Sequence, residues 1–312
     1  MNYELTKGRF APSPTGRMHM GNVFSALLSW LSAKSKGGEW LLRIEDIDPQ
    51  RSKQEYADQL MRDLEWLGLE WDGEPVYQSR RGEIYEHYLE VLRDKGVLYP
   101  SRKTRAERLA VGAPHEDNGK WKMENGECRM ENGKLNAAAD DNTPFAWAVH
   151  VPDETVTYID GHYGPQTISL RKDIGDFIVR RRDGAWAYQL CVTVDDALMG
   201  ITEVVRGRDL LHSAAQQLWL REVLGLNNSE LCTMNYELNY THFPLLVNTA
   251  GQRLSKRDKS LDMGVLREQY TAPQLIGLLA QYAGITAGGE ASPSDLLKLF
   301  DWSTIPTEDI VV

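Results

Sequence analysis

Cysteine is scarce in this chain of 312 residues: Cys128, Cys191 and Cys232 are the only three, and they lie far apart in the sequence. An odd number of widely spaced cysteines argues against a disulfide framework and is typical of proteins from a reducing compartment. No Cys-x-x-Cys pair is present, so the usual zinc-finger pattern is missing. We therefore expect a cytoplasmic protein without disulfide bonds.

Long hydrophobic runs and an excess of positive charge are also missing. No apolar run approaches the length of a membrane span, and no signal-peptide pattern opens the chain, so we expect no membrane contact. The formal net charge of −10 does not favour nucleic acid over the whole surface. Any such surface must be a local basic patch, at residues 102–105 with Arg108, at 180–182 or at 253–259. Each patch taken alone is equally well explained as a solvated surface.

Apolar periodicity predicts strands alternating with helices in the first third of the chain. The expected elements are strands at 7–10 and 40–44 and helices at 21–34, 52–67 and 82–95. Such alternation implies a parallel sheet with crossover helices, and these sheets bind ligands at the C-terminal ends of their strands. The turn after the first strand and Glu45 after the second strand can therefore face one cleft.

The pattern changes after residue 98. Residues 99–143 are polar and weakly periodic, which predicts a loop-rich insertion, and short alternating runs then predict antiparallel β-structure. These runs are 145–151, 155–159 and 168–170. Further on we expect strands at 177–179 and 187–194 that return to the core, a helix at 209–224 and helical structure over 273–300.

The most informative segment is Arg-Phe-Ala-Pro-Ser-Pro-Thr-Gly at residues 9–16, followed by His19-Met-Gly21-Asn22. It places a proline-restricted turn before a helix whose N-terminal N–H groups and dipole attract phosphate. Gly21 would let an adenine ring approach the backbone. Neither a Walker P-loop nor a dinucleotide-binding glycine fingerprint is present. A histidine before a glycine is often only structural, but this context favours an adenosine or phosphate site.

A second segment, Leu254-Ser255-Lys256-Arg257, lies in a basic loop after a strand and a turn signal. Lys256 could place its ammonium charge on phosphate oxygens. On its own, such a segment is usually a solvated loop.

A third set consists of Arg9, Ser13, Glu45, Tyr188 and Arg206. Taken singly, its charged members are ordinary ion-pair residues. Together they match an amino acid with two carboxylates and one ammonium group, because each arginine could bind one carboxylate and Glu45 could hold the ammonium.

The three sets together resemble the glutamate branch of class I aminoacyl-tRNA synthetases. Besides the two segments above, the resemblance includes Leu-Leu-Arg-Ile-Glu-Asp at 41–46, the run 188–196 and Thr-Glu-Val-Val-Arg-Gly at 202–207. It implies an α/β fold: a Rossmann-like parallel-sheet catalytic domain in two halves, a mixed α+β insertion of the acceptor-binding type, and a short, mainly helical C-terminal region. The two halves of the catalytic domain would cover residues 1–98 and 176–245. The insertion would cover residues 99–175, and the C-terminal region 246–312.

The resemblance also implies functional roles. Its partners would be ATP with Mg²⁺, L-glutamate and tRNA, and we expect a monomer. His19 and Lys256 would be catalytic, and the third set above would bind glutamate. The implied ATP-binding residues are Pro12, Thr15, His19, Gly21, Asn22, Leu254, Ser255 and Lys256.

Length favours a short branch of this family. Only 56 residues follow Lys256, which leaves no room for an anticodon-binding region, and the short branch attaches glutamate to the queuosine base in the anticodon of tRNA(Asp). Many of its members hold zinc with a Cys-x-Cys pair and further ligands. Here Ser101 and Lys103 replace that pair and only Cys128 remains, so we expect no zinc.

Two alternatives stay open. One is a truncated enzyme that charges the 3′ end of tRNA(Glu) and needs tRNA for glutamate activation. The other is a non-catalytic paralogue that binds a nucleotide or RNA. The presence of His19, Glu45, Arg206 and Lys256 together argues against the second alternative.

Overall fold

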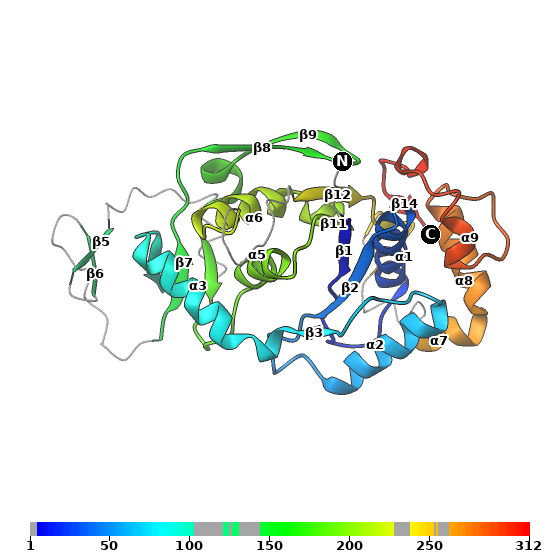
Figure 1. The fold of residues 1–312 in the computed structure, drawn as a ribbon, viewed down its shortest axis with the longest axis horizontal. Coiled ribbons are helices and arrows are strands. Elements are labelled where there is room, and N and C mark those ends of the chain that lie inside the picture. Colours follow the sequence, from blue (N-terminus) through cyan, green and yellow to red (C-terminus); the bar gives the residue numbers. More distant parts are fainter. Residues whose placement is uncertain are drawn as a thin grey trace.

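The fold was obtained as a computed structural model (Figure 1). It describes residues 5–102, 121–124, 127–130, 144–227, 238–252, 254 and 262–312. The expected loop over most of 99–143 and the side chains of Lys103, Cys128, Ser255 and Lys256 lie outside these residues.

Strands and helices follow one another along the chain much as the periodicity predicts. The helices are α1 (Met20–Ser35), α2 (Gln54–Leu67), α3 (Gly82–Asp94), α5 (Tyr188–Leu198), α6 (Leu211–Val223), α7 (Met263–Gln269), α8 (Ala272–Tyr282) and α9 (Pro293–Leu296). The strands are β1 (Lys7–Phe10), β2 (Glu39–Ile44), β3 (Val76–Tyr77), β4 (Leu98–Ser101), β5 (Trp121–Glu124), β6 (Glu127–Met130), β7 (Ala146–Val149), β8 (Thr155–Asp160), β9 (Gly164–Ser169), β10 (Phe177–Arg180), β11 (Glu203–Gly207), β12 (Asn239–Phe243), β13 (Leu246–Val247) and β14 (Ile310–Val311).

Parallel strands form the centre of the molecule. β1, β2 and β3 make one parallel sheet in that order, and β11 pairs in parallel with β12. β11 lies beside β1, and the Thr202 amide donates to the Lys7 carbonyl at 3.0 Å. Gly8 lets α1 pack closely on β1, since a Cβ at this position would lie 3.0 Å from the Ala33 Cβ. The C-terminal ends of β1, β2 and β11 thus share one edge.

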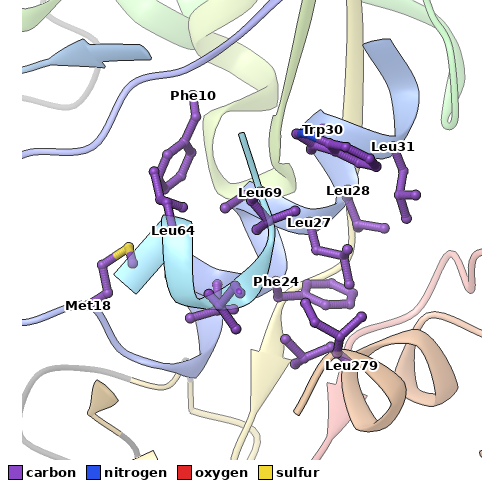
Figure 2. Close-up of a cluster of buried hydrophobic side chains, with 14 of the residues drawn as sticks. Phe10, Met18, Phe24, Leu27, Leu28, Trp30, Leu31, Leu64, Leu69 and Leu279 are labelled. Carbon is purple, nitrogen blue, oxygen red and sulfur yellow. The ribbon is translucent and has the colours of Figure 1, made fainter. Parts of the chain in front are cut away.

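Helix α1 lies in the middle of the main hydrophobic core. Residues from nearly its whole circumference are buried, among them Phe24, Leu27 and Leu28. Figure 2 shows these side chains in one cluster with Leu64 of α2 and Leu279 of α8. Because burial of a leucine side chain contributes about 1.5–3 kcal/mol, the buried residues of α1 fix the helix in the core directly after the turn that precedes it.

Two sequence expectations are wrong in this region. Residues 187–194 form most of helix α5 and not a strand, because the helix is buried along most of its length and a continuous apolar run then carries no readable period. β10 does not return to the parallel strands but pairs antiparallel with β7 in the sheet β10-β7-β4. The helical region expected over 273–300 consists of α8 and α9 with a non-helical stretch between them.

The β8–β9 hairpin connects distant parts of the molecule. It passes over α6 and β12 toward the C-terminal segment (Figure 1). At its turn, His162 Nε2 lies 3.0 Å from the Pro306 carbonyl, and the Tyr163 hydroxyl donates to the Thr307 carbonyl at 2.9 Å. In the described part of the chain, none of the helices has the length and apolar character needed to cross a bilayer.

Candidate active site

A cavity of about 460 Å³ opens at the C-terminal ends of β1, β2 and β11. Ligands of parallel α/β sheets bind at this edge. The residues that the sequence nominates and that line the cavity are Arg9, Pro12, Ser13, Thr15, His19, Gly21, Asn22, Glu45, Tyr188, Arg206 and Leu254. The candidates for adenosine and for glutamate therefore meet in one space, although they come from segments far apart in the chain.

His19 is the N-cap of α1. Its Nδ1 accepts a hydrogen bond from the Gly21 amide at 3.1 Å, and its own amide donates to Asn22 Oδ1 at 3.0 Å, which completes a capping box. Because Nδ1 accepts, the proton of a neutral ring belongs on Nε2. A Cβ at Gly21 would lie 3.1 Å from His19 Cε1, so glycine at this position leaves room for the imidazole itself.

Both ends of the segment that contains Lys256 are attached to the cavity wall. On one side, the Leu254 amide donates to the Leu246 carbonyl at 3.1 Å, and buried Leu254 lines the cavity. On the other side, the Met263 amide donates to the Met18 carbonyl at 2.8 Å, and Asp262 forms a β-bridge with His19. The described residues on either side of Lys256, Leu254 and Asp262, therefore both adjoin the cavity that His19 lines.

Below the cavity lies a buried cluster of charges around Arg43, which is fully buried. Arg43 donates to Asp196 Oδ1 at 2.6 Å and to Glu45 Oε1 at 3.3 Å. Burial raises the pKa of Glu45 to about 7, although the charges of Arg43 and Arg9 act in the opposite direction. Burial also disfavours the ionised form of Asp196, but Arg43 and Arg9 hold its pKa below the usual range. Asp196 is therefore ionised at neutral pH, whereas Glu45 changes between its ionised and protonated forms near pH 7.

Each arginine of the cavity is held at its Nε. Arg9 donates from Nε to Asp196 Oδ1 at 3.3 Å and from Nη1 to the Val205 carbonyl at 3.4 Å. Arg206 donates from Nε to His242 Nε2 at 3.0 Å and from Nη1 to Gln217 Oε1 at 2.8 Å. A guanidinium group has five N–H donors, so donors on the Nη nitrogens remain for a ligand.

Tyr188 reaches the cavity from the first turn of α5. Burial raises the pKa of its hydroxyl, which therefore stays protonated near neutral pH and can donate a hydrogen bond. Although residues 188–194 form a helix and not the expected strand, Tyr188 still lies at this edge of the sheet.

Sequence reasoning missed the residues that hold these side chains. Arg43 and Asp196 lie inside matched segments but were not singled out for the site. His242 and Asp160 gave no usable signal, because they are isolated polar residues in the sequence.

The basic patch at 180–182 is largely neutralised. Arg180 pairs with Glu86 at 2.9 Å, and Arg181 pairs with Asp48 at 2.9 Å and with Asp183 at 2.6 Å. Arg182 is exposed and donates to the Arg102 carbonyl at 2.7 Å, so the patches at 102 and at 182 adjoin.

Of the three positions compared with the zinc ligands of related proteins, the structure describes only the side chain of Ser101. Ser101 is buried at the end of β4, while Lys103 and the side chain of Cys128 lie outside the described residues. Among the residues that the structure describes, no three histidine, cysteine or acidic side chains come together as a metal site.

The parallel strands with a capped helix at their C-terminal edge define a Rossmann-like α/β protein. The family model of the catalytic domain of class I tRNA synthetases (E and Q) matches residues 6–291. The chain therefore belongs to the class I tRNA synthetases for glutamate and glutamine, and it is a ligase. The resemblance read from the motifs is confirmed.

Curated relatives and solved structures agree with this family. The glutamyl-Q tRNA(Asp) synthetase of Nitratidesulfovibrio vulgaris is 40% identical over 318 residues, which cover 98% of this chain and 95% of the relative. That of Cupriavidus metallidurans is 41% identical over 290 residues, or 90% and 87% of the two chains. The glutamate tRNA ligase of Elizabethkingia meningosepticum, solved in complex with its amino acid, superposes with a TM-score of 0.77 at 26% identity, covering 99% of this chain and 67% of that one.

Proposed function

We propose that this protein activates L-glutamate with MgATP to glutamyl-adenylate and transfers the glutamyl group to the queuosine base in the anticodon of tRNA(Asp). The observation that carries the first step is a single cavity lined by two buried arginines and one buried glutamate. This charge set is the complement of glutamate, which has two carboxylates and one ammonium group.

Arg9 and Arg206 would each bind one carboxylate through their Nη groups, since both are fixed at Nε. Charge-assisted bonds of this kind are roughly twice as strong as neutral ones. Glu45, assisted by Ser13 and the Tyr188 hydroxyl, would hold the ammonium group and orient the backbone of the substrate. The buried cluster around Arg43 keeps the floor of this pocket rigid.

In the activation step, an oxygen of the glutamate α-carboxylate attacks the α-phosphorus of ATP. The bond from that phosphorus to the bridging oxygen breaks, and pyrophosphate leaves with the electron pair. No net proton transfer is needed, so catalysis depends on position and charge. His19, through Nε2–H, and Lys256 would stabilise the negative charge on the phosphate oxygens. Pro12, Thr15, Gly21, Asn22, Leu254 and Ser255 would bind the rest of ATP.

The choice of tRNA(Asp) as the acceptor is based on the relatives, whose names specify this tRNA. In the transfer step, a hydroxyl of the queuosine base would attack the adenylate carbonyl; the bond from that carbon to the phosphate oxygen breaks, AMP leaves with the electron pair, and the hydroxyl proton passes to solvent or to the AMP phosphate. The basic residues Arg102 and Arg182, which adjoin at the insertion, are candidates for contacts with the tRNA backbone.

Pyrophosphate exchange tests the activation step. Lys256→Ala should lower glutamate-dependent ATP–pyrophosphate exchange by about 10²–10³, whereas Lys259→Ala, a matched change in the same basic segment, should leave it within about twofold of wild type. Near-normal exchange by Lys256→Ala would refute the role of this lysine.

For the acceptor, labelled glutamate should be transferred to tRNA(Asp) that carries queuosine, and not to unmodified tRNA(Asp) or tRNA(Glu). Exchange that requires tRNA, with charging of tRNA(Glu), would favour the truncated-enzyme alternative.

A further inference from the structure

Asp160 lies at the end of β8, in the turn of the β8–β9 hairpin, and is almost completely buried. Its Oδ1 accepts from the amides of His162 at 3.0 Å, Tyr163 at 2.9 Å and His242 at 3.3 Å. Its Oδ2 lies 2.6 Å from His242 Nδ1. Although burial disfavours the charge, these hydrogen bonds hold the pKa of Asp160 below its usual range, so the carboxylate is ionised.

His242 is fully buried and bridges Asp160 to Arg206. Burial lowers its pKa, with the nearby Arg206 charge acting in the same direction, and the imidazole is neutral near pH 7. A neutral ring has one donor and one acceptor nitrogen. Since Nδ1 faces a carboxylate, it carries the proton, and Nε2 is left to accept from Arg206 Nε at 3.0 Å.

The rest of the Arg206 guanidinium is held just as specifically. Nη1 donates to Gln217 Oε1 at 2.8 Å, and Nη2 donates to the Leu210 carbonyl at 3.1 Å. Gln217 is itself fixed, because its oxygen also accepts from the Tyr240 hydroxyl at 3.2 Å. The guanidinium plane packs over the Tyr240 ring with 5.0 Å between Cζ and the ring centroid. All three nitrogens of the Arg206 guanidinium thus have protein acceptors, and the contact at Nε requires His242 Nε2 to be unprotonated.

We propose that Asp160 and His242 are positioning residues that set the tautomer of one imidazole and thereby aim Arg206 at a carboxylate of glutamate. This inference rests on the proposed activation of glutamate. It gives the β8–β9 hairpin, which also contacts the C-terminal segment, a direct connection to the substrate pocket. Asp160→Asn would break the connection without a large change in shape. An amide N–H facing Nδ1 moves the ring proton to Nε2, where it opposes the Arg206 N–H, as in other carboxylate–imidazole pairs.

The test is steady-state pyrophosphate exchange with glutamate and ATP varied separately, together with melting temperatures. Asp160→Asn should raise KM for glutamate by about tenfold or more, with KM for ATP within about twofold of wild type. Asp153→Asn, an exposed aspartate just before β8, is the matched control and should behave as wild type. His242→Ala should show the same defect, and His242→Gln, which keeps an acceptor for Arg206, should restore much of it.

A double variant separates positioning from general damage. In an Arg206→Lys background, which lacks Nε, Asp160→Asn should add little to the KM for glutamate, because the connection is already lost. Equal losses for glutamate and ATP, multiplicative effects in the double variant, or no advantage of His242→Gln over His242→Ala would overturn the inference while leaving glutamate activation intact. Absence of exchange by the wild-type protein would instead refute the proposed function, and the inference with it.

Discussion

Glu45 should control how glutamate capture depends on pH. The cause is its buried position, which raises its pKa to about 7. An ammonium group is held by the carboxylate form only, and the amino group of free glutamate remains protonated from pH 6 to pH 8. For an acid with a raised pKa, the ionised form is lost as pH falls through that value. The capture of glutamate should therefore weaken on the acid side of pH 7.

The size of the effect follows from the same pKa. About nine tenths of Glu45 is ionised at pH 8 and about one tenth at pH 6. Because kcat/KM reports the ionisation of the free enzyme, kcat/KM for glutamate should fall about tenfold between these two pH values. Glu45→Gln removes a charge-assisted bond worth about 1.5–3 kcal/mol, so kcat/KM at pH 8 should fall by about 10- to 150-fold and lose most of its dependence on pH.

The assay is pyrophosphate exchange with varied glutamate, measured at several pH values for three proteins. The third protein is Glu39→Gln, a matched change at the opposite end of β2, where the carboxylate pairs with Lys7 at 3.1 Å away from the cavity. It should follow the wild-type profile. A flat wild-type profile, or a Glu45→Gln variant with the same profile as wild type, would refute the reasoning.

Two further variants test the packing beneath the site. Gly21→Ala places a Cβ 3.1 Å from the His19 ring, so exchange should fall about tenfold through displacement of the imidazole, with little change in melting temperature. Asp195→Ala removes the acceptor of Gln78, Arg81 and Tyr85, at 2.7, 2.6 and 2.8 Å, and leaves the buried donors of Gln78 and Tyr85 and the partly buried Arg81 unpaired. Urea denaturation should show a loss in the free energy of unfolding of about 3–5 kcal/mol; a loss below 1 kcal/mol would contradict the role of Asp195 as the shared acceptor of these three side chains.

Much of the fold could be predicted because its signals are local. The helix that follows the Pro-Ser-Pro turn and the strand that ends at Ile44, just before Glu45, each have a readable period and a clear stop, and both form close to the expected residues. The run 187–194 failed for a physical reason: α5 is buried along most of its length, and uniform burial removes the contrast on which periodicity depends.

The order of the amino acids was enough to determine the family, the alternation that gives a parallel sheet, and the residue types gathered for a phosphate and for glutamate. These follow from contiguous motifs, which are short in range. Only the tertiary structure decided how the charges are used. Asp160 meets His242 from 82 positions away, and His242 meets Arg206 from 36 positions away. Hydrogen bonds and burial between such distant residues set the aim of Arg206 and the pKa of Glu45, since both depend on which groups folding brings together out of water.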